Sequence, residues 1–250
     1  MTNIIPRPNR LKKKILTRLF GTITSVRTTE PIVALTFDDG PDPIDTPKLL
    51  DLLEHHNIRA TFFVLGIRVL QHPELIDRMV QAGHAIGNHS WSHKSLPTLN
   101  FYKRLQEIKK THNIIKPHDK MLFRPPFGHM DWPTCFDIRR CGYRLVTWNM
   151  VAYDWLDHPE NELMTAIESK LKPGSILLLH DSLYTFERIE YRNRQPLLSA
   201  LSQLFQKLGS QYTFVTLPEL LKRGEAIKVY RHYRGDSDWL KSQMCMESIN

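Results

Sequence analysis

The sequence "IVALTFDDGPD" (residues 32–42) runs from an apolar segment straight into two adjacent aspartates. The apolar part, 32–37, is rich in β-branched and aromatic residues and predicts a buried strand. Asp38 and Asp39 follow it, and a glycine and a proline then end the strand. Two neighbouring carboxylates at the end of a buried strand repel each other and are poorly hydrated. We therefore expect a positive charge or a shared proton beside them.

Short apolar runs of this kind recur along the chain and predict its fold class. They alternate with amphipathic segments that have helical spacing. Strands that alternate with helices imply right-handed crossovers and a parallel sheet. Seven repeats favour an α/β barrel, with parallel strands inside and helices outside, over an open sheet. The predicted strands are 32–37, 60–66, 84–89, 121–126, 143–149, 175–181 and 212–217.

The net charge of +8 is concentrated at the N-terminus. Residues 1–30 carry six of these eight net positive charges, so the rest of the 250 residues, which suit one domain, are nearly neutral. The basic character belongs to an appendage, and we expect no nucleic-acid partner for the domain.

Residues 1–29 have the pattern of a basic amphipathic tail. Arg18 interrupts the apolar segment that a secretory signal needs, and no stretch approaches the roughly 18 apolar residues of a membrane span. We expect a cytoplasmic protein. The tail either packs on the domain, is partly disordered, or contacts the inner face of an anionic membrane as a peripheral helix. The apolar residues at helical spacing are Leu11, Ile15, Leu16, Leu19 and Phe20.

The cysteines indicate a reducing environment. Cys135, Cys141 and Cys245 form no zinc-type pair and are odd in number. Free thiols fit best, although a disulfide between Cys135 and Cys141 stays open.

Polar residues cluster where the predicted strands end. In a parallel β/α barrel the carboxyl ends of the strands meet on one face, which holds the active site. We therefore expect these residues to converge in space although they are distant in sequence. They are Asp38, Asp39, Asn88, His89, Arg124, Asp154, Trp155, His180 and Asp181.

A metal site is predicted within this group. His89 and His93 are four residues apart, the spacing that places two imidazoles on one side of a helical turn. Two imidazoles and one carboxylate are typical transition-metal ligands, and three protein ligands leave the open position of a catalytic site. We predict one divalent ion held by Asp39, His89 and His93. Zinc is the default, and Co²⁺, Ni²⁺ or Fe²⁺ also suit these ligands.

The remaining residues suit acid–base chemistry. Asp38 is a candidate general base for the attacking water, and Arg124 is the candidate partner that keeps it ionised. His180 is a candidate general acid for the leaving group. Asp154 could bind the far nitrogen of His180 and keep its ring cationic, because a nearby carboxylate raises the pKa of a histidine.

Five short motifs, in this order, resemble those of the polysaccharide deacetylase family (carbohydrate esterase family four, the nodulation-type deacetylase domain). The resemblance covers about residues 30–220 and implies a distorted (β/α)7 barrel. We therefore assign 30–224 to a catalytic domain and 225–250 to a loosely structured C-terminal extension. The motifs are "TFDDGP" (36–41), "HSWSH" (89–93), "RPPFG" (124–128), "DW" (154–155) and "LLH" (178–180).

The resemblance implies the same roles for the ligands, the base, the acid and their partners. It adds a backbone N–H near Phe127 that stabilises the oxyanion, and an acetyl pocket lined by Trp155 and Leu178. The chain departs from the family at Val151, where many members carry an aspartate three residues before the "DW" acid. His129 and Trp132 follow the third motif; Trp132 either stacks on a sugar or packs the next helix.

These residues together predict metal-dependent removal of N-acetyl groups from an amino-sugar glycan. An O-acetyl glycan esterase would use the same site. A non-catalytic glycan-binding barrel is a third reading, but such proteins tend to lose the base, a ligand or the acid, and none is lost here. The glycan, the native metal and the oligomeric state stay open.

Overall fold

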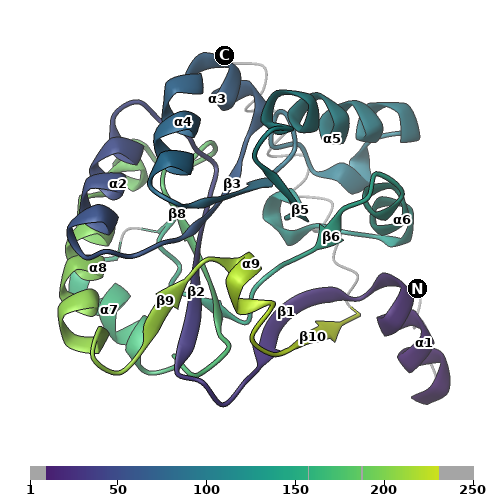
Figure 1. Ribbon diagram of the computed structural model, residues 1–250. Coiled ribbons are helices and arrows are strands. Elements are labelled where there is room, and N and C mark those ends of the chain that lie inside the picture. The colour runs from purple at the N-terminus through teal and green to yellow at the C-terminus, as the bar shows by residue number, and fades with distance from the viewer. Residues whose placement is uncertain (1–9, 157, 187, 231–250) are drawn as a thin grey trace.

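The structure, a computed structural model, describes residues 10–156, 158–186 and 188–230. Its main feature is a curled sheet of parallel strands with helices around the outside (Figure 1). Seven strands follow one another in the order β6-β5-β4-β3-β2-β8-β7, and β9 pairs with the first residues of β2. The strands are β2 (Ile32–Asp38), β3 (Thr61–Val64), β4 (Ala85–Asn88), β5 (Asp119–Phe123), β6 (Arg144–Leu145), β7 (Met150–Val151), β8 (Ile176–His180) and β9 (Thr213–Val215).

The predicted distorted (β/α)7 barrel is confirmed. Each of the seven predicted apolar runs overlaps a strand, whereas β7, with two residues, is too short for a sequence pattern to detect. The helices are α1 (Arg10–Phe20), α2 (Asp45–His55), α3 (Gly66–Gln71), α4 (Pro73–Gln81), α5 (Phe101–Ile115), α6 (Trp132–Arg140), α7 (Glu160–Glu168), α8 (Gln195–Leu208) and α9 (Leu217–Leu220), with short 3₁₀ turns at Leu96–Thr98, Pro126–Gly128 and Ile189–Arg192.

The burial of strand β2 shows that both faces of the sheet are covered. All seven of its residues are buried, and alternate side chains face opposite sides. Leu35 packs in the cluster formed with helices α2 and α8, whereas Ala34 belongs to a second cluster inside the barrel. A strand that is buried on both faces requires a continuous apolar run, and residues 32–37 supply it.

The two ends of the described chain form a second, antiparallel sheet. Strand β1 (Thr22–Arg27) pairs with β10 (Glu225–Val229), and the two lie side by side in Figure 1. Ile23 and Val26 of β1 belong to the cluster inside the barrel. Neither segment has a pattern that predicts a strand, because each is short and its partner lies about 200 residues away. Residues outside the predicted domain boundaries at 29 and 224 therefore share a hydrophobic core with the barrel strands.

Two further expectations concern the cysteines and the membrane. Cys135 and Cys141 are both free thiols, and Cys245 lies outside the described residues. In the part of the chain that the structure describes, every helix is too short or too polar to cross a bilayer.

A glycine substitution tests whether β1 is part of the fold. Gly174 donates to Ile32 O (2.8 Å) and accepts from Val26 N (2.9 Å), and an added Cβ would lie 1.7 Å from Val26 O. We expect Gly174→Ala to lower the free energy of unfolding by about 3 kcal/mol or more, measured by urea denaturation.

Gly142→Ala is the matched control. Gly142 also has a positive φ (88°), but its added Cβ would meet only the flexible end of Met121, at 3.2 Å. Gly142→Ala should lower the free energy of unfolding by about 1–2 kcal/mol, because alanine is strained in the left-handed backbone conformation. Equal effects of the two substitutions would show that β1 is loosely attached.

Candidate active site

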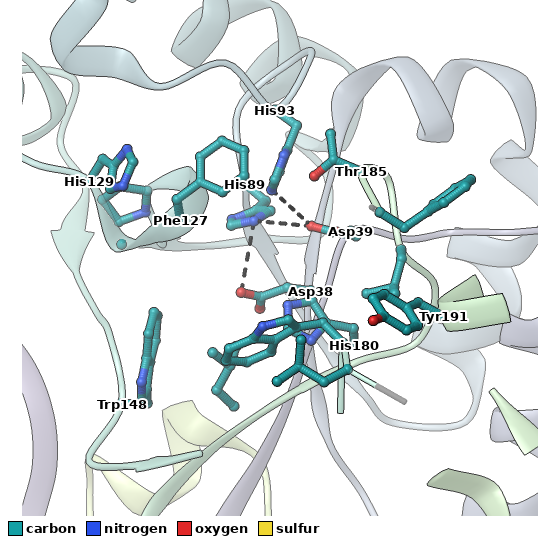
Figure 2. A pocket seen from close by; sticks show the side chains of 17 residues that line it. Asp38, Asp39, His89, His93, Phe127, His129, Trp148, His180, Thr185 and Tyr191 are labelled. Carbon is teal, nitrogen blue, oxygen red and sulfur yellow. Dashed lines mark ion pairs between the residues drawn. The ribbon is translucent and has the colours of Figure 1, made fainter. Parts of the chain in front are cut away.

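The carboxyl ends of the strands surround a cavity of about 330 Å³ (Figure 2). Eight of the ten predicted site residues line it. The other two lie behind its wall: Arg124 is hydrogen-bonded to Asp38, and Asp154 to His180. The eight are Asp38, Asp39, His89, His93, Phe127, Trp155, Leu178 and His180.

The two aspartates reach the same cavity although they are adjacent in sequence. Asp38 continues the inward-facing positions of β2, and the alternation of a strand would direct Asp39 outward. The backbone of Asp39 instead takes a left-handed φ of 79°, and its carboxylate lines the cavity. A left-handed residue other than glycine costs about 1–3 kcal/mol and is found mainly where function requires it.

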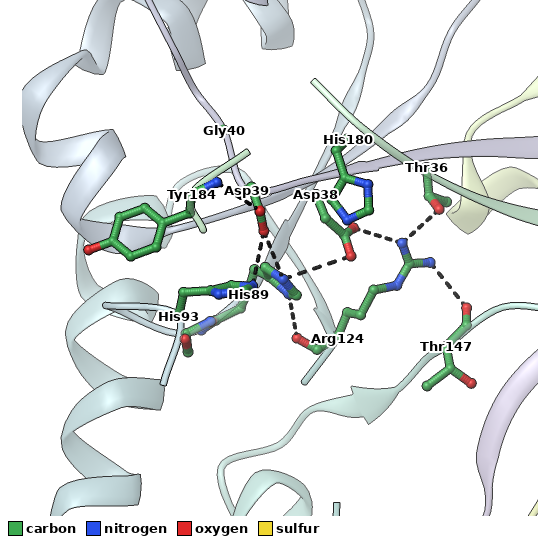
Figure 3. Close-up of polar contacts among 12 residues, drawn as sticks. Thr36, Asp38, Asp39, Gly40, His89, His93, Arg124, Thr147, His180 and Tyr184 are labelled. Atoms are coloured by element: carbon green, nitrogen blue, oxygen red, sulfur yellow. Dashed lines mark hydrogen bonds and ion pairs between the residues drawn. The ribbon is translucent and has the colours of Figure 1, made fainter. Parts of the chain in front are cut away.

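The first positive charge beside the acids is Arg124. Its fully buried guanidinium donates to Asp38 Oδ1 (2.7 Å), Thr36 Oγ1 (2.8 Å) and Thr147 O (3.1 Å), as Figure 3 shows. It also lies 4.2 Å from the centre of the Phe63 ring. Removing one partner of such a buried pair typically costs about 3–5 kcal/mol, because the other charge is left uncompensated. Arg124 therefore holds the Asp38 carboxylate in place and supplies the opposite charge beside it.

The second carboxylate faces two imidazoles. Asp39 Oδ1 lies 3.4 Å from His89 Nε2 and 3.1 Å from His93 Nε2, and its other oxygen accepts from Tyr184 N (3.0 Å). Burial alone would raise the pKa of Asp39, but the imidazoles of His93 and His89 hold it well below the ordinary value. Asp39 is therefore an anion.

The donor set fits a metal cation. His89 Nδ1 lies 2.7 Å from Arg124 O, which can only accept, so Nδ1 carries a proton, and in the neutral ring Nε2 presents its lone pair to the cavity. Asp39 Oδ1 is buried and forms no hydrogen bond of acceptable geometry. One ligand atom each from Asp39, His89 and His93 lie within 4.8 Å of one another. Electron-pair donors that converge in this way suit a divalent transition metal.

The segment that carries both histidines is a loop. The four-residue spacing predicts a helical turn here, and this prediction is wrong. Ser90 and His93 have left-handed φ angles of 75° and 56°. Glu107 of α5 holds the loop, because its carboxylate accepts from Trp91 N (3.0 Å), Ser92 N (2.8 Å) and Ser92 Oγ (2.8 Å). Backbone strain and an external carboxylate thus bring the two rings together.

His180 lies beside Asp38 because β2 and β8 are paired in register at these two residues. Its Nδ1 lies 3.0 Å from Asp154 Oδ1, and its backbone N–H donates to Asp154 Oδ2 (2.9 Å). Burial alone would lower the pKa of His180, but the Asp154 carboxylate outweighs it and raises the pKa to about 9. Arg194 donates to Asp154 (3.2 Å) and keeps that carboxylate in position. The imidazole is therefore protonated at neutral pH.

Comparison with known proteins agrees with this site. A family model described as polysaccharide deacetylase matches residues 25–146. The peptidoglycan-N-acetylglucosamine deacetylase of Bacillus cereus is 34% identical over 198 residues, which cover 77% of this chain and 89% of that protein. The chain belongs to the polysaccharide deacetylase family.

Other relatives support the assignment of this deacetylase. A chitooligosaccharide deacetylase of Sinorhizobium fredii is 32% identical over 205 residues, covering 79% of this chain and 95% of that protein. The solved structure of the Bc1960 peptidoglycan N-acetylglucosamine deacetylase matches with a TM-score of 0.75 at 29% identity, covering 85% of this chain and 98% of that chain. Some relatives are longer, and the chain spans 42% or 39% of their length.

The walls of the deacetylase cavity include most of the residues expected there. Phe127 has a φ of 59°, and the centre of its ring lies 4.3 Å from the centre of the His93 ring. The ring centres of Trp155 and His180 are 5.4 Å apart. Val151, where the family often has an aspartate, pairs with Leu178 in the sheet. Of the two residues after the third motif, His129 lines the cavity. Trp132 does not line it; it begins α6 and stacks on Phe20 and Phe136.

Several residues of the site carry no motif signal. Glu107 and Arg194 act through partners that are distant in sequence, so no local pattern indicates them. Asp181 was noted only as a strand-end residue; it accepts from Gly40 N (3.1 Å) and Thr46 Oγ1, and burial raises its pKa to about 7. It anchors the turn that follows Asp39.

The connection after β8 forms another wall of the cavity. Its aromatic residues are a sequence signal that could have indicated this wall. The wall residues are Leu183, Thr185, Phe186 and Tyr191.

Replacing Glu107 tests how the histidine loop is held. Glu107→Ala removes three hydrogen bonds to the loop and frees the strained backbone of Ser90 and His93 to relax. We expect the affinity of the purified protein for zinc to fall about 10- to 100-fold, measured by competition with a chromophoric chelator.

Lys103→Ala, an exposed change on the same helix, should leave zinc affinity unchanged. If Glu107→Ala binds zinc as tightly as the unaltered protein, the loop holds its shape without Glu107.

Proposed function

We propose that this deacetylase removes N-acetyl groups from an amino-sugar glycan of the peptidoglycan or chitooligosaccharide type. One observation carries the proposal. A carboxylate paired with the buried guanidinium of Arg124 and an imidazole held protonated by Asp154 lie side by side in one cavity, next to a candidate metal site. The substrates named for the relatives from Bacillus cereus and Sinorhizobium fredii support the substrate class.

These two groups suit the two proton transfers of amide hydrolysis. Asp38 accepts a proton from the attacking water. His180 donates from Nε2 to the departing nitrogen, because its Nδ1 proton is bound to Asp154. An amine leaves poorly as an anion, so general-acid catalysis is needed. A divalent cation at Asp39, His89 and His93 would supply Lewis-acid polarisation of the acetyl carbonyl and a lowered pKa for water.

The remaining cavity residues suit binding of an acetylated sugar. A backbone N–H near Phe127 is our candidate oxyanion donor, by resemblance to the family. Trp155 and Leu178 offer apolar surface to the acetyl methyl group. Trp148 and Tyr191 also line the cavity, and aromatic side chains stack well on the apolar faces of sugars.

Acetate release tests the function directly. Metal-loaded protein should release acetate from N-acetylated chitooligosaccharides or peptidoglycan fragments, and a chelator should abolish the release. Asp38→Asn and His180→Ala should each lower kcat about 100-fold or more, because each removes one proton transfer.

Exposed Asp77→Asn is the control and should keep full activity. Inactivity of zinc-, cobalt- and nickel-loaded protein on every N-acetylated glycan would contradict the proposal, and release from O-acetylated xylan alone would assign the site to ester hydrolysis.

The pH profile tests the assignment of the acid. Since the pKa of His180 is raised to about 9, its protonated fraction, and with it kcat, should decline as the pH rises through about 9. Asp154→Asn removes the carboxylate that raises this pKa, so the alkaline decline should move toward the ordinary value of 6.5 or below. Activity at low pH should be partly kept. An unchanged alkaline limb in Asp154→Asn would exclude His180 as the titrating acid.

A further inference from the structure

One side of the molecule exposes apolar side chains from two helices. Ile15 and Leu19 of α1 are 51% and 53% exposed, and Trp132 and Phe136 of α6 are 50% and 45% exposed. Phe20 joins the helices, since its ring stacks 5.6 Å from Trp132, which in turn stacks 6.2 Å from Phe136. We call these five residues the α1–α6 surface. In Figure 1, α1 lies at the edge of the molecule, and it contacts both α6 and β10.

Positive charges surround this surface. Lys14 and Arg18 lie on α1 beside the exposed leucine and isoleucine, and Arg144 and Lys228 are exposed on the neighbouring strands. Burial and then repulsion from Arg139, Arg144 and Arg18 lower the pKa of Lys228, so these cations are close together. Among the side chains that the structure describes, no carboxylate forms an ion pair with Lys14, Arg18, Arg144 or Lys228.

We propose that the α1–α6 surface docks this protein on an anionic phospholipid bilayer. Exposed Ile, Leu, Trp and Phe side chains can enter the boundary between headgroups and acyl chains, while the surrounding cations pair with lipid phosphates. This goes beyond the deacetylase activity and gives the N-terminal helix a function. A membrane location for the N-terminal segment was one reading of the sequence, and the exposed residues of α6 and β10 extend it to the folded domain.

Charge distinguishes this occupant from a second copy of the chain. A two-fold symmetric dimer through the α1–α6 surface would place the cations of one copy against those of the other. An anionic bilayer instead neutralises them, and it accepts the aromatic row without requiring a complementary pocket. Charge complementarity therefore favours lipid.

Vesicle sedimentation of the full chain tests the proposal. The protein should sediment with phosphatidylcholine vesicles that contain phosphatidylglycerol, not with phosphatidylcholine alone, and salt should weaken binding. Arg18→Glu with Arg144→Glu should weaken binding about 25-fold or more, since each cation near an anionic surface contributes about fivefold. Ile15→Gln with Leu19→Gln should weaken binding at every salt concentration. Acetate release from a soluble oligosaccharide should stay unchanged in both variants.

Two matched controls separate the surface from general charge and hydrophobicity. Lys170→Glu with Lys172→Glu makes the same change in net charge near α7, far from α1 in Figure 1, and Leu70→Gln removes an apolar side chain that is 63% exposed on α3. Both should bind vesicles normally. The proposal is overturned if vesicles do not bind the protein, if the controls weaken binding as much, or if Ile15→Gln with Leu19→Gln instead dissociates a dimer in solution. Salt-sensitive binding to an oligonucleotide without vesicle binding would also overturn it.

Discussion

The left-handed backbone of Asp39 is the constraint on which the site depends. Because a strand alternates its side chains, two consecutive aspartates would normally face opposite sides of the sheet. The φ of 79° brings both carboxylates into one cavity, where they can act on the same substrate. Each then has its own compensating group: Arg124 for Asp38, and the two imidazoles for Asp39. The repulsion evident in the sequence is thus resolved by two separate partners, and the carboxylates can do different chemistry.

The same principle separates the proposed base from the proposed acid. Asp38 and His180 are neighbours across paired strands, yet Asp38 is paired with a buried guanidinium and His180 is held protonated by a buried carboxylate. Because their partners have opposite charge, the two groups suit opposite proton transfers in one reaction. The supporting residues are held in turn: Arg194 fixes Asp154, Glu107 fixes the histidine loop, and Asp181 fixes the turn after Asp39. Much of the geometry of the proposed site therefore depends on residues that lie one contact behind the cavity wall.

The sequence predicted what is encoded locally. Strand β2, the aspartate pair and the strand-end histidines are visible because apolar runs end abruptly in polar residues, and a parallel barrel brings such ends together. The four-residue spacing of His89 and His93 indicated a shared ligand site, but not the loop that forms it, because strained φ angles leave no spacing pattern. Contacts between distant segments were predicted where motif residues make them, as for Arg124 and Asp38, and were missed elsewhere. The β1–β10 pair and the bond from Arg194 to Asp154 join residues that only the folded chain places side by side.

The separate functions of the two adjacent aspartates are the central claim, and calorimetric titration of metal-free protein with zinc tests it most directly. The unaltered protein should bind one zinc ion per chain. Asp39→Ala should lose this binding, whereas Asp38→Ala should keep it. Asp38 is ion-paired with Arg124, and its Oδ2 lies 3.8 Å from His89 Nε2, farther than the 3.4 Å of Asp39 Oδ1. If Asp38→Ala loses zinc as completely as Asp39→Ala, or if Asp39→Ala binds zinc normally, this account of the site is wrong.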